Sequence, residues 1–278
     1  MKIIDHLLVN DDDTPVTFKA TPNHGGIYTP QYLVMHYTAA TTTLSTVSWF
    51  QSTLAKASAH LLIARDGTVT QFAPFNVITW HAGKSQWKGL VGLNQFSIGI
   101  EMVNGGRLTK SIGKWICPVD AKRVPDDEVV IAIHKNESSK AAWHDYTEKQ
   151  LKAAIEISAL LVKTYNLKDV VGHEDIAPIR KSDPGPAFPM ASFKSKVMGR
   201  ENDFDEDFVT SADVNIRAGA GTAFATVAPP VPGGTPVRVL KTNANWSFVE
   251  VLKSVNGIMD LEGWIASRFI VLEQGVNS

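Results

Sequence analysis

The residues best suited to chemistry lie in one stretch, residues 171–186, which carries a histidine, a lysine and an aspartate close together. His173 is followed ten positions later by Asp183, and Lys181 stands two positions before that aspartate. Zinc accepts imidazole nitrogen and carboxylate oxygen as ligands, and a catalytic zinc keeps one position open for water. Three prolines and two glycines stiffen the turns, so we predict that His173 and Asp183 are two ligands of a metal site. The alternative is a solvated turn in which Asp175 or Asp183 only caps backbone groups.

A catalytic zinc needs a third protein ligand, and His36 is the candidate. It lies at the end of the apolar run 32–37, which predicts a buried strand. Ligands of α/β proteins gather where such strands end. Taken alone, His36 is also compatible with a buried histidine that has only a structural role.

Glu101 and Lys181 would complete the chemistry. Glu101 lies in the apolar run 96–103, where an unpaired carboxylate is costly. It therefore needs a cationic partner, a metal-bound water or an exposed face. Beside a zinc with water in its fourth position, Glu101 would accept a proton and pass it to a leaving amine. Lys181 would stabilise the negative charge that develops on the carbonyl oxygen. This set suffices for amide hydrolysis, while a binding protein without chemistry and a four-ligand structural zinc site are the alternatives.

The elements that must position these residues alternate between strands and helices. Residues 58–72 predict a hairpin around the tight-turn pair Asp66–Gly67. Residues 147–165 predict an amphipathic helix capped by Thr147. The order predicts an α/β domain in which helices flank a mixed central β-sheet. The full series is strand 32–37, helix 43–54, hairpin 58–72, strand 96–103, helix 147–165, a strand leading to His173, and helix 188–198.

Two segments of this domain, residues 1–198, are less regular. Residues 5–30 are polar and rich in turn formers, so we expect an irregular arm. Residues 104–142 predict a long surface excursion that could hold a pair of strands. Loops of that length usually form walls or lids of functional sites.

The C-terminal part differs in pattern. Residues 199–207 are acidic and poor in apolar side chains, which predicts a linker. From residue 208 to 278, short β-like runs alternate with glycine and proline clusters. This pattern predicts a small all-β barrel as a second domain.

Composition limits the remaining classes. The chain has 278 residues, 44% of them hydrophobic and 20% charged, as in ordinary globular proteins. A net charge of −1 gives no electrostatic case for nucleic acid or an anionic membrane. The single cysteine, Cys117, excludes an intrachain disulfide and is expected to be a small buried hydrophobe. The first residues predict no secretory signal, and no apolar run approaches the ~18 residues of a membrane span.

The sequence resembles the zinc-dependent N-acetylmuramoyl-L-alanine amidases of type 2, the superfamily that includes phage amidases and peptidoglycan recognition proteins. The similarity covers roughly residues 20 to 197, in six stretches that occur in the order typical of the family. The resemblance implies zinc at His36, His173 and Asp183, and catalytic roles for Glu101 and Lys181. It also implies substrate contacts around His60, His81 and Asn94, each of which could equally be structural. The matching stretches are residues 34–39, 58–60, 65–69, 80–83, 93–101 and 172–188.

Two positions depart from the family pattern. Ala59 stands where the phage branch has a catalytic tyrosine, and the phage branch also lacks an acid at the position of Glu101. This chain therefore resembles the bacterial branch. Ile179 stands where the family usually has glycine, and a β-branched residue disfavours positive φ. We therefore expect the ligand loop to bend slightly differently.

The C-terminal part resembles a bacterial SH3-type domain through residues 213–222 and 263–265. Such modules are similar to cell-wall targeting domains, although this one could also serve only to stabilise its neighbour. The leading expectation is a peptidoglycan hydrolase that cleaves between N-acetylmuramic acid and L-alanine, with Zn²⁺ as cofactor. The alternatives are a non-catalytic peptidoglycan-binding protein and a zinc peptidase that cuts within the stem peptide. Without a signal sequence, the protein is expected to be made in the cytoplasm and to reach the wall after lysis or by non-classical export, or to act in cytoplasmic recycling.

Overall fold

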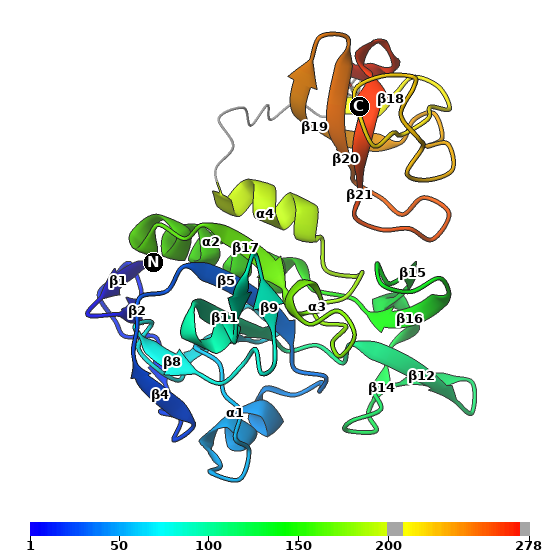
Figure 1. The fold of residues 1–278 in the computed structure, drawn as a ribbon. Helices are drawn as coiled ribbons and strands as arrows, with labels where there is room; N and C mark the ends of the chain where they lie inside the picture. The colour runs from blue at the N-terminus through cyan, green and yellow to red at the C-terminus, as the bar shows by residue number, and fades with distance from the viewer. Residues whose placement is uncertain (199–207, 273–278) are drawn as a thin grey trace. The chain divides into compact units, whose positions relative to one another are not determined.

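A computed structural model describes residues 1–198 and 208–272. Contacts divide the chain into two compact units, Met1–Phe188 and Pro189–Ser278 (Figure 1). The predicted linker, residues 199–207, lies outside the described residues. The predicted domain boundaries at 198 and 208 stay predictions. Among the described residues, no helix is long and apolar enough to cross a membrane.

The first unit is built on a six-stranded mixed sheet, which confirms the predicted α/β class. Strand β5 lies between β17 and β11 and runs parallel to both, while β6 and β7 form the predicted antiparallel hairpin. All but the last residue of β5 are buried, which explains its continuous apolar run. In spatial order the strands are β17 (Asp169–Gly172), β5 (Tyr32–Tyr37), β11 (Ser97–Met102), β6 (Leu61–Ile63), β7 (Val69–Gln71) and β3 (Thr17–Phe18).

The helices of this unit begin close to where the sequence predicts. Helix α1 spans Thr43–Gln51 and α2 spans Glu148–Tyr165. The Thr147 hydroxyl accepts a hydrogen bond from the Gln150 N–H (3.2 Å), as the capping prediction requires. The Gln150 side chain then donates to two backbone carbonyls of the sheet region and so ties α2 to the sheet. A single turn, α3 (His173–Ile176), follows β17 directly.

The N-terminal arm is more regular than predicted. Strand β3 joins the central sheet beside β7, and β4 (His24–Ile27) pairs with β8 (Val77–Thr79). Each of these strands is two to four residues long and finds its partner more than 45 residues away. Local sequence patterns carry no signal for such pairing, so the expectation of an irregular arm was wrong. Two short hairpins complete the strands of this unit. One pairs β1 (Lys2–Ile4) with β2 (Leu7–Val9), and the other pairs β9 (Gln86–Trp87) with β10 (Leu90–Val91).

Residues 107–144 form a second sheet, which we call the side sheet (Figure 1). It has five antiparallel strands, where the sequence predicted at most a pair. Its small core contains Leu108, Val124 and Cys117, and Cys117 is fully buried as expected. The strands, in spatial order, are β14 (Arg123–Val124), β13 (Lys114–Ile116), β12 (Arg107–Ser111), β16 (Lys140–His144) and β15 (Val129–Ile133).

The second unit combines one helix with a five-stranded antiparallel sheet. Helix α4 (Met190–Met198) is held by an Ala191 N–H that donates to Asp260 and by Arg238, which donates to the Ser192 hydroxyl. The sheet has its own apolar core, including Ile216, Val249 and Ile265. Its strands, in spatial order, are β21 (Leu261–Ala266), β20 (Trp246–Val251), β19 (Pro236–Asn243), β18 (Phe208–Thr210) and β22 (Ile270–Leu272).

Candidate metal centre

The central sheet brings the predicted ligands to one edge. His36 is the fifth residue of β5, and Glu101 is its direct neighbour across the β5–β11 pair. His173 follows the end of β17, the other neighbour of β5. Parallel strands end at the same edge of a sheet, so these side chains meet there. The loop after α3 returns Asp183 to the same place.

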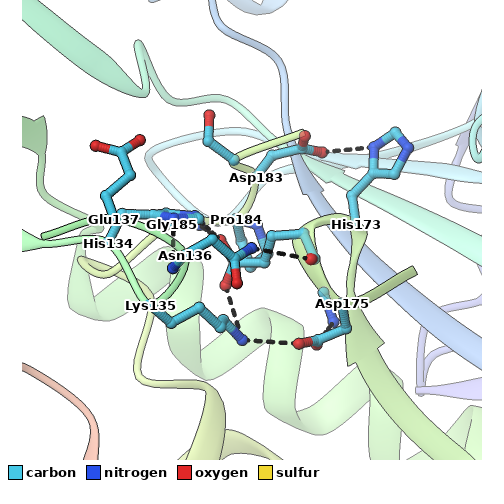
Figure 2. A network of polar contacts seen from close by, with 12 residues as sticks. His134, Lys135, Asn136, Glu137, His173, Asp175, Asp183, Pro184 and Gly185 are labelled. Atoms are coloured by element: carbon cyan, nitrogen blue, oxygen red, sulfur yellow. Dashed lines mark hydrogen bonds and ion pairs between the residues drawn. The ribbon is translucent and has the colours of Figure 1, made fainter. Parts of the chain in front are cut away.

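Three atoms converge at this edge. The Nδ1 atoms of His36 and His173 lie 2.9 Å apart, and each lies 2.9 Å from Oδ2 of Asp183. Figure 2 shows Asp183 directed at the His173 ring. All three residues are buried, with at most 6% of their surface exposed. The structure therefore brings together the three predicted ligands, which lie up to 147 residues apart in the sequence.

The hydrogen bonds of His81 fix the tautomer of His36. His81 Nε2 faces the carbonyl oxygen of Ser97 (3.1 Å), so it must donate. Burial, and next the His36 and His60 rings, hold the pKa of His81 well below its ordinary value, so its Nδ1 carries a lone pair. That lone pair accepts from His36 Nε2 (3.0 Å). The remaining nitrogen of His36, Nδ1, therefore presents a lone pair to the centre.

Arg180 settles the tautomer of His173 in the same way. His173 Nε2 lies 3.0 Å from the carbonyl oxygen of Ala82. Arg180 Nη2 has two hydrogens, which it gives to the carbonyls of Ala82 and Lys84 (both 2.9 Å). Its contact with His173 Nε2 is longer, 3.3 Å. The ring proton of the neutral, metal-binding form of His173 thus belongs on Nε2, and in that form Nδ1 presents a second lone pair.

The convergence of two lone pairs and a carboxylate fits a metal cation. Burial, and then the His173 ring, lower the pKa of His36 to about 4, so its imidazole is neutral near pH 7. Three acceptors in close contact repel one another unless a cation lies among them. Two imidazoles and one carboxylate are a ligand set that catalytic zinc sites use.

Glu101 has the environment of a proton carrier. Its Oε2 atom is buried and has no hydrogen-bond partner among the described residues. Burial, and next the charge of Asp183, raise the pKa of Glu101 to about 8, against an opposing influence of Lys181. A carboxyl group with such a pKa exchanges a proton near neutral pH. The alternative that the Glu101 carboxyl group faces solvent does not hold for Oε2, because this atom is buried.

These groups open into one pocket of about 700 Å³. Glu101, Lys181 and the three ligand residues line it together with exposed apolar side chains. Trp49 is 53% exposed, Trp80 37% and Val119 69%. Sequence reasoning missed Trp49 and Val119, because an aromatic residue on a helix and a valine in a loop carry no functional signal by themselves.

The three predicted substrate contacts have different surroundings. His81 lines the pocket, whereas His60 and Asn94 do not. His60 is fully buried, with its Nδ1 accepting from the Gly99 N–H (3.1 Å), and burial lowers its pKa to about 3. Asn94, in the 3-10 turn Leu93–Gln95, accepts from the Ala82 N–H (2.7 Å) and so steadies the residue whose carbonyl orients His173. Substrate contacts by all three residues stay predictions.

The substitution of glycine by isoleucine in the ligand loop causes no backbone strain. Ile179 is fully exposed and is not among the described residues with positive φ. The loop therefore has no need of glycine at this position, while a bend that differs from the family's stays a prediction.

The lone-pair arrangement predicts an effect of His81 on metal affinity. The variant His81→Phe keeps a ring but removes the acceptor of His36 Nε2–H, so His36 is free to turn its proton toward the centre. We expect zinc affinity to fall about 10–100-fold, the usual effect of losing such an outer partner. A competition titration against a chromophoric chelator measures it. His6→Phe is the matched control, because His6 bonds Tyr165 instead (2.8 Å); equal affinities in all three proteins would contradict the assignment.

Comparison with known proteins identifies relatives of the first unit. A family model described as N-acetylmuramoyl-L-alanine amidase (Amidase_2) matches residues 27–186, more than half of the chain. The 1,6-anhydro-N-acetylmuramyl-L-alanine amidase AmpD of Escherichia coli is 34% identical over 141 residues, 50% of this chain and 57% of AmpD. The N-acetylmuramoyl-L-alanine amidase AmiD of Escherichia coli is 30% identical over 181 residues, 60% of this chain and 53% of AmiD.

Solved structures extend the similarity to the fold. The crystal structure of a selenomethionine derivative of AmpD superimposes with a TM-score of 0.51 and 25% identity, covering 71% of this chain and 99% of that one. By sequence, this chain spans little more than half the length of the curated relatives it matches.

Proposed function

The chain belongs to the N-acetylmuramoyl-L-alanine amidase family, and from this we propose that it hydrolyses the amide bond between N-acetylmuramic acid and the L-alanine of the peptidoglycan stem peptide. The observation that carries the proposal is the convergence of two imidazole lone pairs and the Asp183 carboxylate in one pocket with Glu101 and Lys181. The names of AmpD and AmiD both specify an amide bond between a muramic acid derivative and L-alanine. The name of AmpD specifies the 1,6-anhydro form of the sugar, and that of AmiD does not.

In this proposal His36, His173 and Asp183 hold a zinc ion. Zinc supplies Lewis-acid polarisation and water activation when it is bound. Glu101, with its pKa raised to about 8, accepts a proton in the pocket and returns it to the leaving amine. Lys181 places a positive charge where the amide oxygen becomes negative. His81 and Asn94 hold the ligands in position through their hydrogen bonds to His36 and to the Ala82 backbone.

The pocket has features that suit a muropeptide. Its two exposed indole rings, Trp49 and Trp80, offer flat apolar faces with polar edges. Such surfaces fit the face of a sugar or the backbone of a peptide. The charged groups that line the pocket supply the few polar contacts that orient a ligand. The predicted partner is therefore peptidoglycan or a fragment of it.

We further propose that residues 208–278, the part of the second unit that contains its sheet, form an SH3-type module that targets the wall. Its five antiparallel strands and separate apolar core support this assignment. A cavity of about 730 Å³ in this unit, lined among others by Arg217, Trp246 and Arg268, gives it a surface on which a polar chain could bind. On this proposal the substrate is polymeric wall, although the catalytic pocket would also accept soluble fragments.

Product analysis tests the proposed activity. Zinc-loaded protein is incubated with purified peptidoglycan, with and without a chelator, and the products are identified by mass spectrometry. We expect free stem peptides that begin with L-alanine, and their loss on chelation. Peptide fragments without that terminus would indicate a zinc peptidase instead. Absence of products from protein that still sediments with the wall would indicate a binding protein.

A further inference from the structure

Glu174 is a buried carboxylate that the proposed chemistry does not use. It directly follows the ligand His173 in the chain, and 3% of its side chain is exposed. It is not among the three residues that could hold the metal ion. A buried carboxylate is costly unless it is hydrogen-bonded. Its bonding partners therefore show what its burial achieves.

The partners of the Glu174 side chain come from the side sheet and from the far end of the ligand loop. Oε2 accepts from His134 Nε2 (2.6 Å) and from the Gly185 N–H (3.1 Å). Oε1 lies 3.0 Å from the Lys135 ammonium. His134 Nδ1 accepts from the Asn136 N–H (3.2 Å), which places the ring proton on Nε2, the donor to Glu174. Three donors, from His134, Lys135 and the Gly185 backbone, are thus directed at the carboxylate.

The backbone of Glu174 joins the same two regions. Its N–H donates to the carbonyl of Asp183 (2.8 Å), the residue that supplies the carboxylate ligand. Its own carbonyl accepts from the Asn136 side chain (3.3 Å). Lys135 also bridges to Asp175 (2.9 Å), which in turn accepts from the Gly172 N–H (2.7 Å). Figure 2 shows Lys135 and Asn136 reaching from their turn toward this loop.

A packing contact reinforces these polar bonds. The Trp143 ring, on β16, stacks on His134 with ring centroids 5.6 Å apart. A Cβ added to Gly185 would lie 3.1 Å from the same Trp143 ring, and Gly185 has a positive φ of 76°. Only glycine meets both conditions without strain. The loop end that follows Asp183 is therefore seated against the side sheet.

We propose that residues 134–136, at the turn between β15 and β16, form a clamp that holds the ligand loop in its metal-binding conformation, with Glu174 as the positioning residue. The clamp fixes His173 and Asp183 on one framework, so their ligand atoms meet without needing the metal to order the loop. A site organised in advance loses less conformational freedom on binding and binds its ligand more tightly. The inference rests on the metal site of the proposed function.

The decisive variant removes the two clamp side chains that lie on the protein surface. Lys135 and Asn136 lie on an exposed turn, so the double variant Lys135→Ala/Asn136→Ala is not expected to unfold the protein. We expect its zinc affinity, measured by chelator competition, to fall about tenfold, and that of Glu174→Ala about 10–100-fold. Lys135→Arg keeps a cation that can bridge the two carboxylates, and it is expected to retain the wild-type affinity.

Glu137→Ala is the matched control on the same turn. Glu137 pairs with Arg107 (3.0 Å between Oε1 and Nη1), and among the described residues its hydrogen bonds stay within the side sheet and its turn. This variant is expected to bind zinc like the wild type. A second readout needs no metal: hydrogen exchange of the Glu174 and Gly185 amides in metal-free protein should speed up in the double variant and not in the control.

The outcomes separate the clamp from the metal site. If wild type binds zinc and the folded double variant binds it equally tightly, with unchanged amide exchange, the clamp proposal is wrong and the metal site stands. If wild type binds no zinc, the proposed function fails and the clamp fails with it. Should Glu174→Ala unfold, the double variant and Lys135→Arg still decide.

Discussion

Replacing Asp183 with asparagine is expected to abolish zinc binding and activity while the metal-free protein stays folded. The carboxylate oxygen Oδ2 faces two nitrogen lone pairs at 2.9 Å, an arrangement that attracts a cation. In Asp183→Asn an amide nitrogen in this place donates a hydrogen to those lone pairs and removes the negative charge. The hydrogen bonds of the amide then satisfy the histidine lone pairs without a metal ion. Zinc affinity should fall by more than about 100-fold, because even outer partners of a metal ligand are worth 10–100-fold.

Three measurements check this expectation. Metal content after dialysis and chelator competition give the zinc affinity, and thermal unfolding of the metal-free protein gives its stability. Asp127→Asn, the same substitution at an exposed residue of the side sheet, is the control. Wild-type zinc binding by Asp183→Asn would show that this carboxylate is not a ligand. A loss of the fold would show instead that the carboxylate is needed for folding.

Replacing Glu101 with glutamine is expected to remove most of the activity and leave zinc in place. Glutamine keeps the shape of the side chain but cannot carry a proton between water and the leaving amine. Loss of a general acid–base group typically lowers the rate by about 10²–10⁴-fold. The measurement is kcat on a soluble muropeptide, together with the zinc content of the variant. Activity within a few-fold of wild type would remove Glu101 from the mechanism.

The same substitution should raise the stability of the metal-free protein, with a defined pH dependence. The pKa of Glu101 is raised from 4.5 to about 8 in the folded chain, chiefly by burial. Between these two values the folded chain holds a proton that the unfolded chain has lost, so this group lowers the free energy of unfolding as pH rises. Each pKa unit corresponds to about 1.4 kcal/mol.

Thermal unfolding of wild type and Glu101→Gln at pH 5 and pH 8, both with chelator present, tests this dependence. The advantage of the variant should grow across that window and level off above about pH 8. An advantage that does not change with pH would mean that Glu101 titrates normally. Activity and stability therefore move in opposite directions at this residue, as expected where a site keeps a buried ionisable group for its chemistry.

Much of the candidate site could be predicted from the sequence. His173, Lys181 and Asp183 share one short loop, so their proximity follows from chain connectivity alone. His36 and Glu101 each lie near the end of an apolar run, and buried parallel strands bring their carboxyl ends to one edge. Residue type and strand order suggested a common location, the family resemblance named the five residues, and in the structure all five line one pocket.

The sequence did not predict the strands whose partners are distant. The short strand β3 pairs with a residue run more than 50 positions away, and strand β12 of the side sheet has a single apolar residue, Leu108, among polar ones, as a surface loop would. Hydrophobic periodicity reports local burial, and it is silent about pairings of two or three residues. The five strands between Arg107 and His144 were therefore expected to be mostly loop.

By itself, then, the sequence determined which groups could bind a metal and move a proton, because those properties belong to side-chain chemistry and to the order of strands. Only the tertiary structure decided their states. The proton of His36 is placed by His81, that of His173 by the Ala82 carbonyl, and the raised pKa of Glu101 by burial. The contact between Glu174 and the turn at His134 likewise joins segments 40 residues apart. Tautomers, pKa values and clamping contacts depend on which atoms meet in space, and no local pattern in the chain encodes that.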